Sequence, residues 1–469
     1  PLAYGCIQGI RHGFVKEIGS FIAIIFGIYL ARFWSGSLSS VIAEWVDVSP
    51  QVSLIIAYVI TFIIGTLSIH LLAYLLSKIL DLVKIGWVNK IIGALFGTFK
   101  CGIFPKGCWF KKKILILQIK SIYYMTAEYK EILYDLLRTS SPSGYEEQTI
   151  DLFVKSIAPY VDEIYTDVMG NCIAHKKGNG KKILLMAHAD EIGLIISHID
   201  EKGFLYFKEI GGLDTNVLPG QRVLINGRNK RIVGVVGKKP VHLQEQSDNA
   251  KDFKSEDLWI DIAVSNKKEA MEDVQLGSIA TVISDPVLMS NSLVSSRSLD
   301  DKIGLLILIR VAQCLYESNS DNDIYFVASV QEELGARGAQ TITERIMPEI
   351  GIVLDVTHAT DYPTMSIIKD GDIKLGDGVV IALGPNMNKE VIHNLLNIAT
   401  SNNIKHQLEI IAHPTGTDAR MVQVAGNGVK TGLISIPCRY MHTPNEMVSL
   451  EDADNAIILL TKYLQNSVN

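Results

Sequence analysis

Long apolar runs dominate the first quarter of the chain, and the longest of them predicts a membrane-spanning helix. No Lys, Arg, Asp or Glu occurs from Val48 to Ser77. At about 1.5 Å per helical residue, roughly 20 apolar residues cross the hydrocarbon core of a bilayer. We therefore expect a transmembrane helix over residues 53–77. A buried core helix of a soluble domain is the less favoured interpretation of so long a run.

Two shorter apolar runs flank this one. Residues 18–31 predict a second, less complete span, whereas residues 91–104 contain Lys100 and fit a re-entrant or surface-lying helix as well as a crossing. Basic residues flank both outer ends of the 18–77 hairpin, while the 35–52 loop has no Lys or Arg. The positive-inside rule therefore predicts that both ends of the hairpin are cytoplasmic, and that the chain after residue 104 is cytoplasmic too if 91–104 does not cross.

After residue 125 the pattern changes to alternating helices and strands. The expected elements are a helix over 128–137, a helix that starts at a capping box Ser143–Glu146, strands over 171–175 and 183–187, and then helix 301–316, strand 324–330, helix 337–346, strand 350–355, helix 388–402, strand 405–411 and helix 449–465. Strands separated by helices predict an α/β fold with a mostly parallel sheet covered by helices.

The stretch between these two sets of elements has a different character. Residues 192–288 contain short, strand-rich segments and no long helical period, which predicts a small inserted β-barrel. The expected organisation is a helical membrane domain (1–104), a junction (105–124), an α/β catalytic domain in two pieces (125–191 and 289–469) and the barrel domain (192–288).

Composition separates the chain into two parts of opposite charge. Of its 469 residues, 48% are hydrophobic and 20% are charged, which excludes both a disordered chain and a protein made only of membrane helices. Residues 1–124 hold 12 of the 44 Lys and Arg but only 4 of the 50 Asp and Glu. The basic part favours contact with an anionic membrane face, and the acidic part favours a soluble domain with no nucleic-acid partner.

The junction and the cysteines bear on cellular location. Residues 105–124 mix lysines with an apolar run and end just before Met125, as expected for a natural fusion or a frameshifted pair of neighbouring genes. The six cysteines are scattered, with no C-x-x-C pair, which favours a reducing compartment. We expect a membrane protein with its catalytic domain on the cytoplasmic side, or a cytoplasmic enzyme if the two parts are separate proteins.

Candidate chemistry first appears where a predicted strand ends. His188-Ala189-Asp190 follows the apolar strand 183–187, and alternation along a strand puts His188 and Asp190 on the same face. His188 could bind a metal ion while Asp190 accepts its second ring N–H and fixes the tautomer. Taken alone, such a pair more often has a structural role.

An acidic pair, Asp300-Asp301, precedes the apolar helix that follows the barrel. The simpler interpretation is an N-cap with an acidic first turn. The alternative is that Asp300 bridges two cations while Asp301 caps the helix, and both can hold together.

Three more positions lie at the ends of elements. Glu332-Glu333 follows the strand 324–330, and consecutive residues point to opposite sides, so one carboxylate can bind metal while the other takes a proton from water. Asp355 ends a strand, and His442 lies in a polar turn before the last helix. Together with His188 and Asp300 these positions predict metal-assisted hydrolysis. G-x-S-x-G, H-E-x-x-H and P-loop motifs are absent from the sequence.

Residues 125–469 resemble the glutamyl aminopeptidase family of two-metal peptidases, which includes TET and deblocking aminopeptidases and proteins once labelled endoglucanases. The motifs that carry the resemblance are Ala187–Gly193, Leu299–Gly304, Gln331–Ala339, Asp355, Gly416–Ala419 and Tyr440–Pro444. The resemblance implies an inserted β-domain, peptide substrates and large homo-oligomers.

The same resemblance implies a ligand set for two divalent ions, zinc or cobalt. It assigns His188, Asp300 and Asp355 to one ion, and Asp300, Glu333 and His442 to the other.

The resemblance also implies the remaining site roles. It makes Glu332 the general base and Asp190 the partner that orients His188.

Residues 1–104 resemble the colicin V production protein family of small integral membrane proteins. The resemblance rests on Gly9–Glu17 before one apolar helix and on Gly86–Gly97 after the next. This family offers no catalytic residue.

The function expected from these observations is a metal-dependent aminopeptidase fused to a membrane segment. A glycoside hydrolase with paired carboxylates is one alternative, although histidines at strand ends fit that chemistry poorly. A membrane scaffold whose peptidase-like domain only binds is the other, and it predicts that metal is absent.

Overall fold

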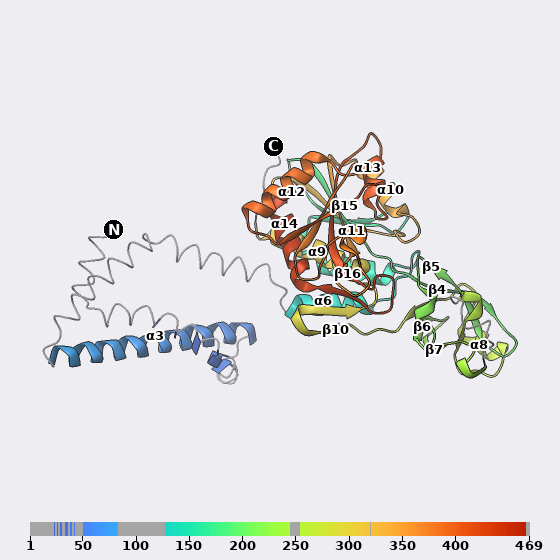
Figure 1. Ribbon diagram of the computed structural model, residues 1–469, viewed down its shortest axis with the longest axis horizontal. Coiled ribbons are helices and arrows are strands. Elements are labelled where there is room, and N and C mark those ends of the chain that lie inside the picture. Colours follow the sequence, from blue (N-terminus) through green and yellow to red (C-terminus); the bar gives the residue numbers. More distant parts are fainter. Residues whose placement is uncertain are drawn as a thin grey trace. The chain divides into compact units, whose positions relative to one another are not determined.

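The computed structural model describes scattered positions between residues 23 and 42 and the ranges 50–82, 127–243, 254–318 and 320–465 (Figure 1). The chain forms two compact units, Pro1–Ser121 and Ile122–Asn469. The predicted segment 91–104, the junction 105–124 and Met125 lie outside the described residues.

The first unit contains a 33-residue helix, α3 (Pro50–Leu82), so the helix expected over 53–77 is present and longer than predicted. Its segment 56–75 has a mean hydropathy of 2.1 and is long and apolar enough to cross a membrane. The hydroxyl of Thr61 donates to the Ala57 carbonyl at 2.7 Å, which satisfies a polar side chain within the helix itself. Of the 18–31 run, the four described positions are helical.

The second unit is built on an eleven-stranded sheet in the order β1-β2-β12-β3-β13-β16-β17-β11-β10, with β14 paired to β16 and to β15. Its strands are β1 (Glu163–Thr166), β2 (Cys172–Lys176), β3 (Lys182–His188), β10 (Val287–Leu288), β11 (Leu293–Ser296), β12 (Asp323–Ser329), β13 (Ile350–His358), β14 (Val379–Leu383), β15 (His406–Ile410), β16 (Lys430–Arg439) and β17 (Glu446–Ser449).

The sheet is mixed, so the expectation of a mostly parallel sheet is wrong. Only the central strands β12, β3, β13 and β16 form a continuous parallel set, with β14 and β15 as one further parallel pair. The flanking strands are antiparallel to their neighbours. Several of the flanking strands have only two to four residues, too short for an apolar period to reveal them.

Helices cover both faces of the central strands. The helices of this unit are α6 (Ala127–Arg138), α7 (Glu147–Ile157), α8 (Lys267–Asp273), α9 (Leu299–Tyr316), α10 (Arg337–Ile346), α11 (Ile367–Asp370), α12 (Lys389–Ser401), α13 (Ala419–Val424) and α14 (Leu450–Gln465). Two glycines let helices approach the sheet closely: a Cβ on Gly351 would lie 2.5 Å from Val422 of α13, and one on Gly432 would lie 2.8 Å from Val391 of α12.

A small closed barrel is inserted between β3 and β10 and projects to one side of the α/β core (Figure 1). Its strands are β4 (Gly193–Ile199), β5 (Leu205–Ile210), β6 (Arg222–Asn226), β7 (Arg231–Gly237), β8 (Trp259–Asp261) and β9 (Ile279–Val282), closed in the order β4-β5-β8-β7-β6-β9. Its own apolar core includes Ile196, Phe207, Val223 and Ile260, all buried. The first barrel strand, β4, begins at Gly193, five residues after β3 ends at His188, so the insert adjoins the predicted site.

Candidate metal centre and active site

The five predicted metal ligands come together at the carboxyl ends of the parallel strands. They form two groups that share one member: the donor atoms of His188, Asp300 and Asp355 all lie within 4.8 Å of one another, and so do those of Asp300, Glu333 and His442. His188 ends β3 and Asp355 lies in β13, whereas Glu333 lies in the loop after β12. Open α/β sheets place their sites at this edge because the loops there converge.

Asp300 lies between the two groups, with one oxygen toward each. Its Oδ1 is 2.9 Å from His188 Nε2, and its Oδ2 is 3.4 Å from His442 Nε2. His188 Nε2 is 4.0 Å from Asp355 Oδ1, and His442 Nε2 is 3.4 Å from Glu333 Oε1. His188, Asp300 and Asp355 are buried.

The chemistry of this donor set fits a pair of divalent cations. Two imidazoles and three carboxylates are the nitrogen and oxygen donors that zinc and similar ions bind. Burial, reinforced by the charge of Asp300, raises the pKa of Glu333 to about 7 and raises the pKa of Asp355 well above its ordinary value. Buried carboxylates this close are unfavourable as anions unless positive charge is added between them.

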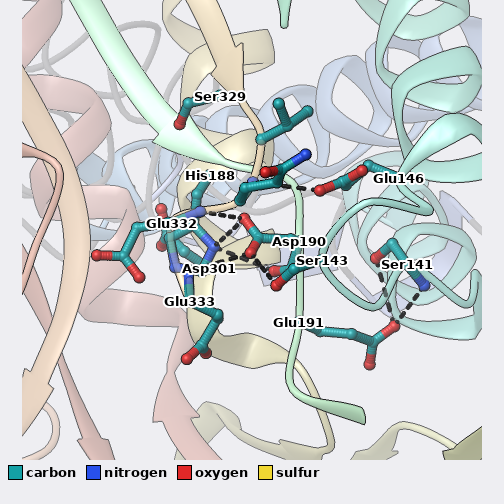
Figure 2. A network of polar contacts seen from close by, with 12 residues as sticks. Ser141, Ser143, Glu146, His188, Asp190, Glu191, Asp301, Ser329, Glu332 and Glu333 are labelled. Atoms are coloured by element: carbon teal, nitrogen blue, oxygen red, sulfur yellow. Dashed lines mark hydrogen bonds and ion pairs between the residues drawn. The ribbon is translucent and has the colours of Figure 1, made fainter. Parts of the chain in front are cut away.

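Asp190 lies against His188, which it is predicted to orient, and it also binds the loop after β12. His188 Nδ1 lies 3.0 Å from the backbone oxygen of Asp190 and 3.4 Å from its carboxylate. That carboxylate accepts the backbone N–H of Glu332 at 2.9 Å, the N–H of Glu333 at 3.1 Å and the hydroxyl of Ser143 at 2.6 Å. Figure 2 shows Ser143, Asp190 and His188 joined in one network. Asp190 therefore fixes both adjacent glutamates.

The predicted capping box at Ser143–Glu146 is wrong. Glu146 occupies the N-cap of α7 in a helical conformation without a side-chain cap, and Ser143 donates to Asp190 instead. The buried Glu146 carboxylate accepts the N–H of Gly144 at 2.7 Å and that of Gln331 at 3.2 Å. The S-x-x-E pattern thus serves the active-site loop rather than the helix end.

Other buried carboxylates hold the segments around Asp300. Glu446 accepts the backbone N–H of Asp300 at 3.1 Å and that of His442 at 3.0 Å, so one side chain ties two ligand-bearing segments together. Asp301 accepts the N–H of Gly304 at 3.1 Å, which bears out its expected helix-capping role. Asp300 and Asp301 themselves have non-helical backbone angles, so the regular part of α9 begins after them.

A buried ionic cluster lies next to this segment. Glu191 accepts Lys302 Nζ at 3.1 Å and the backbone N–H of Ser141 at 2.8 Å, and it also pairs with Arg297. Burial alone would raise the pKa of Glu191, but the two cations lower it to about 2. The cluster connects the start of the barrel insert to α9. Removing either cation would leave a buried charge without its partner.

Glu332 belongs to neither ligand group. Its Oε1 is buried and has no hydrogen-bond partner among the residues that the structure describes. Burial, with the nearby charges of Asp355 and Asp418, raises its pKa to about 10. A carboxylate that is held by its backbone, free at its oxygen and close to the ligands can accept a proton from a reacting molecule.

Four of the five ligands (Asp300, Glu333, Asp355 and His442) and Glu332 line a cavity of about 580 Å³. The barrel insert contributes to its rim, because the backbone oxygen of Gly212 lies 2.9 Å from His442 Nδ1 and so orients that ring. Sequence reasoning missed the contacts of Gly212, Glu146, Glu191 and Glu446. Gly212 lies within the barrel insert and the three glutamates lie in or next to predicted motifs, but only the fold reveals what they contact.

Comparison with known proteins agrees with this geometry. Residues 170–459 match the family model of the M42 glutamyl aminopeptidases, and residues 2–105 match that of the colicin V production protein. The lysyl aminopeptidase of Pyrococcus furiosus is 36% identical over 71% of this chain and 96% of its own length.

Solved structures give the same result. An aminopeptidase from Desulfurococcus kamchatkensis is 34% identical and matches with a TM-score of 0.68 over 72% of this chain and 95% of its own. The TET1 peptidase of Pyrococcus horikoshii, which can assemble into a tetrahedron or a large octahedral shell, is 30% identical with a TM-score of 0.65, covering 72% and 99%. These matches favour the peptidase over the glycoside hydrolase. The chain belongs to the M42 glutamyl aminopeptidase family.

Proposed function

We propose that residues 127–465 act as a two-metal aminopeptidase that removes N-terminal residues from peptides. The observation that carries the proposal is the pair of ligand groups sharing Asp300, with the unpartnered carboxylate of Glu332 beside them in an open cavity. The names of the relatives, which are aminopeptidases, support the same activity.

The ligand residues would hold two divalent ions. The mixture of nitrogen and oxygen donors favours zinc or cobalt. His188 and Asp355 would serve one ion, Glu333 and His442 the other, and Asp300 both. Such ions supply Lewis acidity toward the scissile carbonyl and lower the pKa of water.

The protein's own residues would perform the proton transfers. Glu332 takes the proton of the attacking water and returns it to the leaving amine. Asp190 keeps Glu332 in place by binding the N–H groups of Glu332 and Glu333. The cluster of acidic side chains suits the protonated amino group at the start of a peptide, which accounts for exopeptidase rather than endopeptidase action.

A metal-removal experiment tests this proposal. The purified chain should release the first residue of a peptide with a free N-terminus and leave the N-acetylated peptide intact. Treatment with 1,10-phenanthroline and dialysis should abolish release, and Zn²⁺ or Co²⁺ should restore it, as followed by chromatography of the products. Undiminished cleavage by the metal-free protein, or equal cleavage of the acetylated peptide, would contradict the proposal.

We further propose that the peptidase part forms homo-oligomers. The support is the likeness to the TET1 peptidase, whose assemblies are oligomeric. The match covers 99% of that relative's length, so the likeness extends over its whole chain.

We also propose that the N-terminal part attaches the enzyme to the cytoplasmic face of a membrane. The match of residues 2–105 to colicin V production protein and the apolar segment of α3 support attachment. The basic residues outside the predicted hairpin support the orientation. An antibody to the C-terminal part should detect the full-length chain in the carbonate-washed membrane fraction of cells. A shorter soluble band alone would instead indicate two separate proteins.

A further inference from the structure

One carboxylate of the cavity, Glu409, takes no part in either ligand group. It is the penultimate residue of β15 and is half-buried. Its Oε1 accepts the hydroxyl of Thr357 at 2.8 Å. No Lys or Arg of the described residues forms an ion pair with it. Burial raises the pKa of Glu409, while the hydrogen bond from Thr357 and the charge of His358 lower it in part.

The position of Glu409 follows from the register of β13. Thr357 stands two residues after the ligand Asp355 on the same strand, so the two side chains share a face and are roughly 6.5 Å apart along it. Glu409, bonded to Thr357, therefore lies one side-chain position beyond the metal centre. A substrate whose first carbonyl meets that centre would extend a long first side chain toward Glu409.

The other lining residues suit the stem of such a side chain. Apolar groups face the same cavity: Val356, Ile411, Pro414, Leu433 and Met441. Lys and Arg combine a flexible apolar stem with a terminal cation, and they bury the stem when the cation finds a partner. A group of apolar side chains with a carboxylate beside them, set apart from the metal ligands, is complementary to that combination.

An imidazole, His358, and a guanidinium, Arg420, also line the cavity. His358 is exposed and next to Thr357 in the chain. Arg420 lies on the side of the Glu332 loop, because a Cβ on Gly335 would be 3.6 Å from Arg420 Nη2. Apart from the metal ligand Asp355, Glu409 is thus the acidic group on the wall formed by β13 and β15.

We infer that the cavity selects peptides with an N-terminal Lys or Arg, and that Glu409 is the residue that recognises the cationic side chain. The inference rests on the proposed aminopeptidase activity and adds the substrate class to it.

The experiment compares the full-length protein on aminoacyl-p-nitroanilides of Lys, Arg, Met and Glu. Methionine has a long, unbranched and uncharged side chain, so the ratio of kcat/KM for Lys to that for Met isolates the contribution of charge. We expect wild-type protein to favour Lys and Arg. In Glu409→Gln the Lys-to-Met ratio should fall roughly 10- to 100-fold, as expected for loss of a charged hydrogen bond. In Glu409→Arg it should fall further, and the Glu-to-Met ratio should rise.

Glu390→Gln is the matched control. Glu390 lies at the start of α12 on the surface and pairs with Lys430, away from the cavity lining. The Lys-to-Met ratio of kcat/KM for Glu390→Gln should stay within about twofold of that for wild type. A wild-type protein that prefers Met, or a ratio unaltered by both Glu409 variants, overturns the inference while leaving the peptidase activity standing. Hydrolysis of none of the substrates would refute the proposed function itself.

Discussion

Replacing Glu332 with Gln should lower kcat roughly 10²- to 10⁴-fold while the protein keeps its metal ions, because general acid–base transfer contributes about that factor. The amide has nearly the same size and leaves the two ligand groups intact. It cannot take a proton from water. The backbone N–H of residue 332 still donates to Asp190, so the loop keeps its position. Steady-state kinetics with a peptide substrate and metal analysis by mass spectrometry measure the two properties on one sample.

The adjacent Glu333→Gln variant is the matched comparison. Both glutamates follow β12 and both donate their N–H groups to Asp190, but only Glu333 belongs to a ligand group. Glu333→Gln should lose metal as well as activity, whereas Glu332→Gln should lose activity alone. If Glu332→Gln retained wild-type kcat, or if its metal content fell as far as that of Glu333→Gln, Glu332 would not be the general base.

The ligand set could be predicted from sequence because its members stand at the ends of predicted elements. An apolar strand fixes the position of the residue after it, and parallel strands bring their carboxyl ends to one edge. His188 follows this rule directly, whereas the expectation that Asp355 ends its strand is wrong, because β13 continues to His358. The pattern also identifies the acidic pair Glu332-Glu333, although it does not tell which member binds metal.

The carboxylates that hold the loops could not be predicted in the same way. Glu446 joins Asp300 and His442, which are 142 residues apart in the chain, and Glu146 joins a helix start to the loop after β12. Their partners are backbone N–H groups, which every residue except proline carries, so no residue type signals the contact. The local pattern predicted that Ser143 caps a helix, but in the structure its hydroxyl donates to Asp190.

Strand β16 illustrates a second limit of prediction from sequence. The strand β16 contains Gly432 and Pro437, which interrupt an apolar run, yet it lies in the parallel core of the sheet. Pro437 is tolerated because only part of this strand needs a hydrogen-bonded neighbour on both sides. The barrel was predictable because its segments are short, strand-rich and separated by turns. Its contact with His442 through Gly212 was not, because that contact depends on how the insert folds back.

Asp300→Asn should abolish binding at both metal positions, whereas Asp355→Asn should weaken binding at one. Asp300 presents Oδ1 to His188 and Oδ2 to His442, so it is the member common to both ligand groups. An amide offers one oxygen and no charge, so it cannot bridge two cations as a carboxylate does. The backbone N–H of residue 300 still donates to Glu446, which keeps the segment in place.

Thermal unfolding separates the two variants without reference to activity. A ligand that binds only the folded protein raises Tm, by an amount that grows with the ratio of ligand concentration to Kd. Added Zn²⁺ should raise the Tm of metal-free wild-type protein strongly, that of Asp355→Asn by less, and that of Asp300→Asn hardly at all. The kcat of Asp300→Asn should fall at least about 10³-fold, because the Lewis-acid contribution is lost. Equal metal content and an equal Tm increase in both variants would mean that Asp300 serves one position only, and the shared-ligand arrangement would have to be abandoned.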